Sequence, residues 1–540
     1  MNSRVQDSGI ERYTAVDTDL ALLWILLWSH TQIYPCMPSF VYLTTALIGL
    51  GGALFGYDIG IISGVLAFDS FKLAFDIDDW SNHLEEKGLI VSSFVIGNML
   101  GALSASGLAD SLGRKRTLVT ATFCFLAASS IQVLASTLIT LYIGRLLSGW
   151  AIGMLSSVVP LYNSELAPAA IRGRLISFNQ ISMTGGILVS FWVGYLLRNV
   201  NNGWRYALAG QMIPALIILI GSPFLPRSPR WLIKIGRYEE AKTNLYRLRA
   251  IPLHTSTDVV HDEYIEMMQT IQQEQSIQTD TWRYLFSNAL SRKRLLICMF
   301  LQTGQQLTGI NVIMYYMPFV AQSIGFGGQD HGLLAQGING IVNFLSTFVA
   351  FFFVDRMGRR IALIAGGLFM AIAMGTLGCL GMTYAVISSD SKSVTVENKY
   401  AGWMCVVSIY LYVFGFAWSW GPVCWLYPTE VLPTSQRAKG VSLTTASNFM
   451  FNFLIAQFSP MLRDRLNFKL FVLFAGFCFG MVIFVYFFIP ESRGRSLEEL
   501  GNAFGTSDVA ANDDKNESLL RQEIGNEQQR LNTGMSSAVR

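Results

Sequence analysis

Charged residues are scarce in this chain. Asp, Glu, Lys and Arg make up 14% of its 540 residues, whereas 52% are hydrophobic. Soluble domains carry about 25% charged residues, so this shortage excludes an ordinary soluble protein and indicates a polytopic membrane protein. The net charge is only +3 and the sequence contains no basic block, so we expect no nucleic-acid partner.

Cysteine and histidine are also few and show no functional spacing. Six of the 7 cysteines lie in apolar runs without pairing or metal-ligand spacing: Cys124, Cys298, Cys379, Cys405, Cys424 and Cys478. They are typical of small buried apolar residues and exclude a disulfide or zinc framework. The 5 histidines are scattered in loops and flanks. Because no apolar run combines a nucleophile with a base, we expect no enzyme, no metal and no cofactor.

Long apolar runs, by contrast, are abundant. Twelve are long enough to cross a bilayer as helices, in two sets of six. They lie at about 41–67, 88–109, 117–136, 138–161, 174–197, 206–225, 295–322, 332–354, 360–384, 402–428, 440–461 and 468–489.

Basic residues in the short connections predict the orientation of these spans. Lys and Arg follow the even-numbered spans, as at 114–116, whereas the connection 69–87 is mainly acidic. Such a bias places the even-numbered span ends in the cytosol. Both termini and the polar stretch 226–293 are then cytosolic. Within that stretch, Tyr238–Arg249 and Asp262–Gln273 are predicted to form short helices.

The two sets of spans also resemble each other in sequence. Asp110 to Arg116 after span 2 is echoed by Asp355 to Arg360 after span 8. A duplicated half is typical of transporters that bind substrate between two bundles. The predicted organisation is an N-terminal cytosolic or interfacial segment (1–40), a six-helix bundle (41–225), a cytosolic linker (226–293), a second six-helix bundle (294–489) and a largely disordered tail (490–540). The apolar segment at 20–36 is too short to span, and we interpret it as an interfacial helix or an extension.

Two opposite charges stand alone inside the predicted spans, Asp58 in span 1 and Arg145 in span 4. A charge at the centre of a membrane costs roughly 2.5 to 3.5 kcal/mol on insertion scales, so such residues are candidates for ion handling. We predict that the two meet, and that the acid exchanges its arginine for a proton. The alternative is a fixed ion pair between spans 1 and 4. Gly52, Gly56, Gly60 and Gly64 form a ridge for close helix packing, and Asp58 points away from it.

Amide side chains gather in span 7. Gln302, Gln305 and Gln306 share one helix face with Gly309, and Asn311 follows. Amides both donate and accept hydrogen bonds, which suits a ligand covered in hydroxyl groups and suits a charged one badly. The alternative is hydrogen bonding between helices. In span 10 a helix break at Gly421-Pro422 precedes Trp425, whose indole can stack on the apolar face of a pyranose.

Together these motifs resemble the sugar porter family of the major facilitator superfamily, and most closely its fungal-type proton symporters. The resemblance covers roughly residues 45–500 and rests on Gly-Tyr-Asp at 56–58, Gly144-Arg145, Pro160, Arg172-Gly173-Arg174, Pro229 to Leu232, Gln305 to Asn311, Gly421 to Trp425 and Pro490-Glu-Ser492, beside the paired motifs named above. It implies an all-α membrane protein of twelve helices. One departure is Arg227, which stands where the family usually has an acid.

The resemblance also implies a sugar site and a gate. Gln180, Asn343 and Asn448 would complete a polar lining with Gln305, Gln306, Asn311 and Trp425, and Phe55 and Phe449 would form apolar walls. Charged residues at the cytosolic helix ends would hold the two halves together in the outward-open state: Asp110, Arg114, Glu165, Arg172, Asp355, Arg359, Glu430 and Arg437. Proton-linked members carry an acid at the position of Asp58, although some passive members do as well.

The predicted function is therefore inward transport of a neutral monosaccharide by alternating access, with hexose as first substrate and a proton as co-substrate. Passive hexose facilitation, proton-coupled transport of a polyol such as myo-inositol, and sugar sensing are the alternatives. We expect a monomer embedded in the lipid bilayer, in the plasma membrane. A vacuolar or other internal membrane stays open, because the sequence has no outward-facing Asn-x-Ser/Thr sequon.

Overall fold

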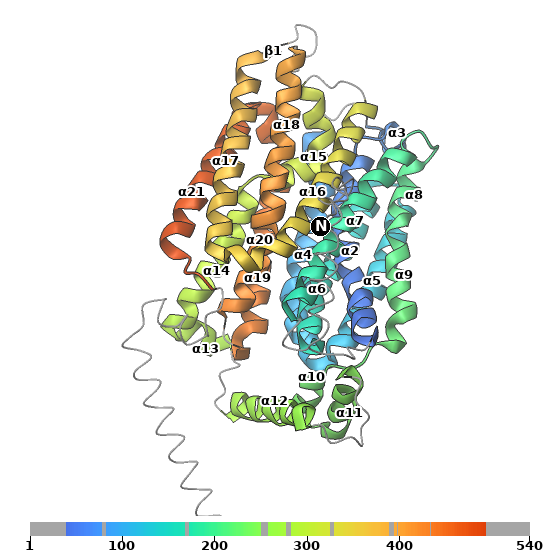
Figure 1. Ribbon diagram of the computed structural model, residues 1–540. Helices are drawn as coiled ribbons and strands as arrows, with labels where there is room; N and C mark the ends of the chain where they lie inside the picture. The colour runs from blue at the N-terminus through green and yellow to red at the C-terminus, as the bar shows by residue number, and fades with distance from the viewer. Residues whose placement is uncertain are drawn as a thin grey trace, which may run out of the picture.

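The computed structural model describes residues 39–77, 83–167, 172–249, 258–276, 282–324, 329–387, 394–396, 398–432 and 434–492. Most of these residues are helical, and the long helices run side by side as one elongated bundle (Figure 1). The segment 1–38, with its apolar run at 20–36, and the predicted tail beyond residue 492 lie outside the described residues.

The first half contains the helices predicted from the first six apolar runs. They are α2 (Ser39–Val65), α4 (Leu84–Leu112), α5 (Arg114–Val133), α6 (Leu138–Leu166), α7 (Arg172–Leu197), α8 (Gly203–Gly210) and α9 (Met212–Gly221), followed by the 3-10 turn η2 (Ser222–Phe224). The short helix α3 (Asp69–Ala74), in the connection between the first two spans, was not predicted. The sixth span thus consists of α8 and α9, which meet at Gln211.

The linker forms a separate layer of short helices: α10 (Pro229–Lys234), α11 (Tyr238–Arg249), α12 (Asp258–Ser276) and α13 (Trp282–Ser287). The helices α11 and α12 were predicted, and α12 is longer than expected. An apolar face joins the layer, because Trp231, Leu245 and Tyr264 pack together. We call the end of the bundle that carries α10–α12 the linker side (Figure 1).

The second half contains α14 (Ala289–Leu307), α15 (Ile310–Ser323), α16 (Gln329–Met357), α17 (Arg359–Tyr384), α18 (Lys399–Gly415), the π-helical turn η3 (Phe416–Trp420), α19 (Gly421–Val431), α20 (Thr434–Leu466) and α21 (Lys469–Phe488). A short antiparallel hairpin pairs β1 (Ala385–Ile387) with β2 (Val394–Val396). This hairpin was not predicted, and it marks the opposite end of the bundle, the hairpin side (Figure 1).

Two further predicted spans are divided midway. Span 7 divides into α14 and α15 at Gly309, whose φ of +88° is a left-handed conformation that favours glycine. Span 10 changes to the π-helical turn η3 directly before Gly421, where the sequence predicted a break. Irregular backbone at membrane depth is tolerated where it is buried in protein or lines a cavity.

Within the described residues, ten segments are long and apolar enough to cross a membrane. Two of the twelve spans, α14–α15 and α20, are not among these ten. The first is split into a 19-residue and a 14-residue helix, and the second carries many Ser, Thr and Asn side chains. These two spans face each other across the polar centre of the second half.

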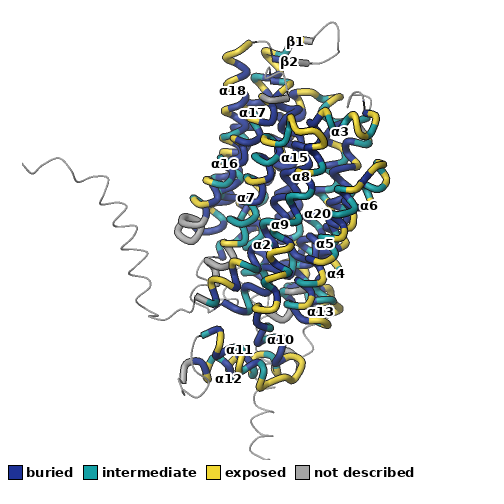
Figure 2. The backbone as a smooth tube through the Cα atoms, turned by 90° about the vertical axis from the view of Figure 1, so that its right-hand side faces the viewer, coloured by how far each residue is buried: buried dark blue, intermediate teal, exposed yellow. Residues whose placement is uncertain are grey.

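Apolar side chains cover the outside of the bundle as well as its core. Ile220, Ile372 and Phe487 are exposed by 74%, 70% and 71%, and buried and exposed stretches alternate along the helices (Figure 2). Exposed apolar faces of this extent belong against lipid. The interior in turn is packed by large buried side chains such as Trp204 and Trp420.

Candidate functional site

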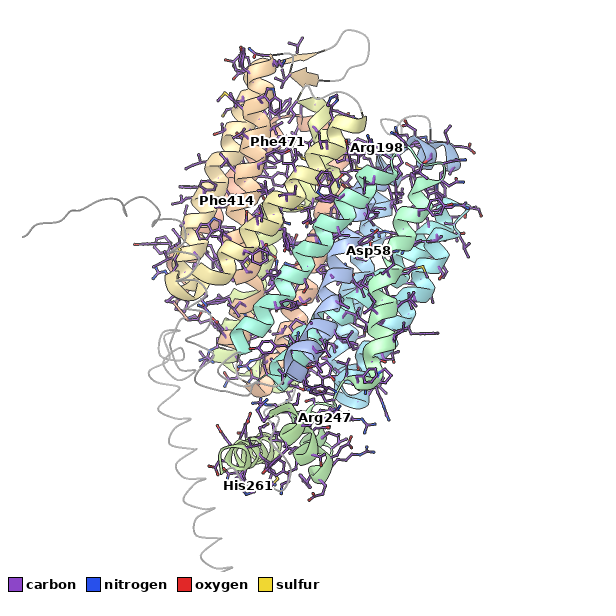
Figure 3. All side chains as sticks on the ribbon, turned by 45° about the vertical axis from the view of Figure 1, so that its right-hand side comes forward. Asp58, Arg198, Arg247, His261, Phe414 and Phe471 are labelled. Atoms are coloured by element: carbon purple, nitrogen blue, oxygen red, sulfur yellow. The ribbon has the colours of Figure 1, made fainter. Side chains whose placement is uncertain are left out.

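The centre of the first half is an ion pair between Asp58 of α2 and Arg145 of α6. The two side chains are fully buried and Arg145 donates to Asp58 Oδ1. Arg145 Nε also donates to the carbonyl oxygen of Ile90 at 3.2 Å, and its guanidinium lies 4.5 Å from the centre of the Phe94 ring. Asp58 lies midway along the bundle (Figure 3). The two charges thus meet as expected from their isolation in the sequence.

The second oxygen of the Asp58 carboxylate, Oδ2, takes no part in the ion pair. Among the described residues, Asp58 Oδ2 has no hydrogen-bond partner, and neither has Arg145 Nη2. A buried carboxylate oxygen without a donor is costly while the group is charged. Protonation would supply the missing hydrogen and weaken the attraction to Arg145. The geometry therefore allows both a fixed pair and an exchange of the arginine for a proton.

Close packing of α2 against α7 keeps the Asp58 side chain directed toward α6. A Cβ atom on Gly56 would collide with the carbonyl oxygen of Met183, and one on Gly60 would collide with Ser190. The glycine ridge therefore faces α7, while Asp58 faces α6 on the other side of the same helix. This is the arrangement that the spacing predicted.

The centre of the second half is a network of amides. Asn448 of α20 donates to Gln302 Oε1 at 2.6 Å and to Gln305 Oε1 at 2.8 Å, and Gln306 Nε2 donates to Asn448 Oδ1 at 2.7 Å. Asn311, beyond the break at Gly309, donates to Gln306. The break thus places side chains of α14 and α15 around one point.

Backbone oxygens from the irregular turn complete this network. Gln305 Nε2 donates to the carbonyl oxygen of Trp420 at 2.9 Å, and Gln302 Nε2 to that of Cys424 at 2.9 Å. The two amides therefore connect α14 to the η3–α19 junction. Interhelical hydrogen bonding and a polar lining, the two interpretations of these amides, occur here together.

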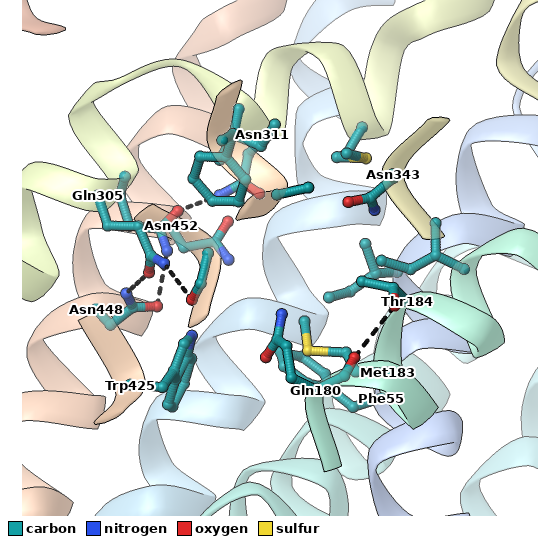
Figure 4. Close-up of a pocket in the computed structure, with 18 residues that line it drawn as sticks. Phe55, Gln180, Met183, Thr184, Gln305, Asn311, Asn343, Trp425, Asn448 and Asn452 are labelled. Atoms are coloured by element: carbon teal, nitrogen blue, oxygen red, sulfur yellow. Dashed lines mark hydrogen bonds between the residues drawn. The ribbon is translucent and has the colours of Figure 1, made fainter. Parts of the chain in front are cut away.

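A cavity lies between the two halves and holds about 610 Å³ of empty space, counting space open to solvent. Its lining includes eight of the nine residues predicted for substrate binding: Phe55, Gln180, Gln305, Gln306, Asn311, Asn343, Trp425 and Asn448. Figure 4 shows Phe55 and Gln180 facing Trp425 and Asn448 across it. None of the described residues that line it is charged, so the cavity suits a neutral ligand.

The ninth predicted residue, Phe449, does not line this cavity. Its side chain is fully buried, and its ring packs behind Phe55 at 5.9 Å and behind Trp425 at 6.3 Å between ring centres. Phe449 follows Asn448 directly in α20, so the two side chains lie on different faces of that helix. Its place is to support two wall residues from behind.

Further lining residues were missed by the sequence analysis. Ile59, Met183, Thr184, Ile187, Ile310, Met314, Phe416, Ala417, Gly421 and Asn452 also line the cavity. Helical spacing was a usable signal for two of them, because Thr184 lies four residues after Gln180 and Asn452 four residues after Asn448. The apolar ones carry no such signal.

The cavity is closed toward the hairpin side. On that side Gln336 of α16 donates to Ser63 of α2, and both residues are buried. On the cavity face of α7, exposure rises toward the linker side, since Thr184 is 3% exposed and Gln180, one turn nearer that side, is half-buried. Trp425 on α19 is also half-buried. These exposures place the opening of the cavity on the linker side.

The predicted gate residues form ion pairs inside each half. Arg114 Nη2 lies 2.9 Å from Glu165, and Arg114 Nη1 lies 3.2 Å from Asp110. In the second half Arg359 Nη2 lies 2.8 Å from Glu430. Each of these pairs joins helices of the same half.

The expected connection between the halves thus does not involve these pairs in this conformation. The cavity opens toward the linker side, so the helix ends that would have to meet are the ones beside its mouth. Arg437 is half-buried, and the side chains of Arg172 and Asp355 lie outside the described residues. A contact between the halves in the outward-open state stays a prediction.

Taken together, two helical halves, a polar cavity between them and irregular helices at its walls define a multi-pass membrane transporter of the major facilitator type. The chain belongs to the sugar transporter family, since residues 44–504 match the family described as sugar (and other) transporter.

Several known proteins are similar over nearly the whole chain. Sugar carrier protein C of Ricinus communis is 35% identical, with 88% of this chain and 92% of the relative covered. Sugar transport protein 1 of Arabidopsis thaliana is 36% identical, with 87% and 90% covered. The resemblance to sugar porters is thereby confirmed. These relatives come from plants, and the narrower likeness to fungal-type members stays a prediction.

Solved structures show the same fold. The proton:xylose symporter XylE, bound to 6-bromo-6-deoxy-D-glucose, has a TM-score of 0.73 and 28% sequence identity, with 87% of this chain and 100% of that chain covered. An inward-open conformation of the xylose transporter XylE from E. coli has a TM-score of 0.69 and 28% identity, with 86% and 99% covered. The major facilitator fold predicted from the sequence is therefore confirmed.

Proposed function

We propose that this protein carries a neutral hexose inward together with one proton. The cavity supports a neutral, hydroxyl-rich substrate, because its polar side chains are amides and hydroxyls, and Trp425 offers a flat apolar surface for one face of a pyranose ring. Gln180, Gln305, Gln306, Asn311, Asn343 and Asn448 would hold the hydroxyl groups. The relatives named as sugar transport proteins and the proton:xylose symporter support the same substrate class.

The observation that carries proton coupling is the spare oxygen of the buried Asp58 carboxylate beside Arg145. A proton on Asp58 would release Arg145 and permit the two halves to reorient around bound sugar. One charge moving through 100 mV supplies about 2.3 kcal/mol, enough for roughly 50-fold accumulation. In this proposal the linker side and both termini face the cytosol, and the protein acts as a monomer in the plasma membrane.

The test is uptake of labelled glucose into proteoliposomes with and without a proton gradient. We expect accumulation that a protonophore abolishes. Asp58→Asn is expected to lose accumulation and keep sugar exchange, because the amide still accepts from Arg145 but cannot be charged. Accumulation by Asp58→Asn would refute the coupling, and gradient-independent uptake would favour a passive facilitator.

A competition panel addresses the substrate. Hexoses, pentoses and myo-inositol are each added in excess to labelled glucose under the same gradient. We expect hexoses to compete most strongly. Preferential competition by myo-inositol would replace hexose by a polyol as substrate while leaving the coupling result intact.

A further inference from the structure

Three cations from separate elements meet at the linker side of the first half. Lys115 at the start of α5 donates to the carbonyl oxygens of Leu225 at 2.7 Å and Pro223 at 3.2 Å. Pro223 lies in η2, Leu225 directly follows it, and both precede Arg227 in the chain. Arg227 follows Leu225 by two residues, and its carbonyl oxygen is bonded by Asn244, which lies one turn before Arg247 on α11. We call Lys115, Arg227 and Arg247 the basic cluster.

Hydrogen bonds hold the cluster in place. Asn244 of α11 donates to the carbonyl oxygen of Arg227 at 3.3 Å, and Arg247 follows Asn244 by three residues on the same helix face. The Arg247 guanidinium lies 4.5 Å from the centre of the Phe40 ring at the start of α2. Figure 3 shows Arg247 where the linker helices meet the bundle.

Within the part of the chain that the structure describes, acidic side chains balance only part of this charge. Glu240 lies 2.9 Å from Arg227 and 3.4 Å from Arg237, so one carboxylate serves two arginines. Sugar porters usually carry an acid at the position of Arg227. An arginine there changes the local charge by two units, and turns a mixed site into a basic one.

The cluster lies at the end of an apolar face that is open to lipid. Ile213, Leu216, Ile217, Ile220 and Phe224 form one side of α9 and η2 and are exposed by 62%, 46%, 47%, 74% and 69%. This side ends next to Pro223, the residue whose carbonyl oxygen accepts from Lys115. This arrangement matches the two parts of a phospholipid. Acyl chains can lie along the apolar side chains of α9, and the charged headgroup then lies beside the cations.

We propose that the basic cluster binds the headgroup of an anionic phospholipid whose acyl chains lie along α9. Lysine and arginine near a membrane surface attract anionic lipids, and arginine forms paired hydrogen bonds with phosphate oxygens. Arg247 is exposed and Lys115 and Arg227 are half-buried, so all three are within reach from the membrane surface. This site is distinct from the sugar cavity and does not depend on the proposed function.

The test measures lipid binding by the full-length protein purified in detergent. Short-chain phosphatidylserine or phosphatidylcholine is titrated, and retained lipid is counted by native mass spectrometry. We expect preferential retention of phosphatidylserine. Each cation removed, in Lys115→Gln or Arg247→Gln, is expected to weaken this retention about fivefold. Arg227→Glu is expected to abolish it, and thermal unfolding checks that this variant, whose new carboxylate faces Glu240, still folds.

Lys242→Gln is the matched control, because Lys242 lies on α11 on a different face from Arg247. It should retain phosphatidylserine like the unaltered protein. Equal retention of the two lipids, an undiminished preference in Arg227→Glu, or an equal loss in Lys242→Gln would each overturn the site. Soluble O-phosphoserine is added in a further arm. If it displaces phosphatidylserine at equal concentration, the site is a phosphate site rather than a lipid site.

Discussion

The ammonium group of Lys87 in α4 lies 3.1 Å from the centre of the Phe319 ring in α15. The same group lies 5.6 Å from the centre of the Tyr316 ring, and Lys87 is only 4% exposed. The contact joins the two halves on the hairpin side, where the cavity is closed. Nearby, Ser92 of α4 donates to Gln457 of α20 at 2.6 Å, which also crosses between the halves.

We expect Lys87→Met to loosen closure on the hairpin side. A desolvated cation–π contact contributes up to about 2 kcal/mol, so its loss would shift the balance between the two conformations by as much as roughly 30-fold. Spin-label distances across the hairpin-side ends of α4 and α15 measure this shift. Lys72→Met is the control, since Lys72 forms an exposed pair with Asp69 inside one half. Unchanged distances in Lys87→Met would contradict the assignment.

A second prediction concerns the stability of the buried ion pair. Arg145→Met leaves the Asp58 carboxylate without its cation and should lower the free energy of unfolding by about 3–5 kcal/mol. Adding Asp58→Asn to that variant removes the stranded charge and should restore most of the loss. Denaturation of the two single variants and the double variant gives the coupling between the sites. Additive losses would mean that the two charges do not stabilise each other.

A third prediction tests whether Gln302, which lies behind the cavity wall, positions Asn448 in that wall. Gln302 is buried, does not line the cavity, and bonds Asn448 and the Cys424 carbonyl oxygen. Gln302→Leu removes the side-chain donor of the Cys424 carbonyl oxygen, which costs about 1–3 kcal/mol. It also removes one acceptor of the Asn448 amide, which keeps its bonds to Gln305 and Gln306. We expect the altered position of Asn448 to weaken sugar binding. Equilibrium binding of labelled glucose measures the loss. Gln132→Leu, in the interior of the first half, controls for general destabilisation, and equal effects of the two would rule out a positioning role.

The glycine ridge leads to a fourth prediction. Gly56→Ala would force α2 away from the Met183 carbonyl oxygen of α7 and should destabilise the protein by about 1–3 kcal/mol. Gly476→Ala in α21 is the matched control, because a Cβ atom there meets no heavy atom within 4 Å. Thermal unfolding of the two variants checks the difference. Similar melting temperatures would show that α2 and α7 are not held at their closest approach by Gly56.

Local chemistry was sufficient to predict much of this protein. Twelve apolar runs stood out because a membrane needs long apolar helices, and the pairing of Asp58 with Arg145 followed because two isolated charges in such runs are costly apart. The common face of Gln302, Gln305 and Gln306 followed from helical periodicity. The break in span 10 at Gly421-Pro422 was indicated by residue type.

The tertiary structure alone decided how these elements meet. Helical periodicity says which residues share a face, but not which face turns toward the cavity, so Gln302 and Phe449 lie behind the wall while Asn452 and Thr184 line it. The Lys87–Phe319 contact and the basic cluster join segments far apart in the chain, and no local pattern carries such pairings. Residue chemistry determined which segments can span the membrane and which buried charges must be paired. Helix rotation and packing between the halves determined which side chains face the substrate path.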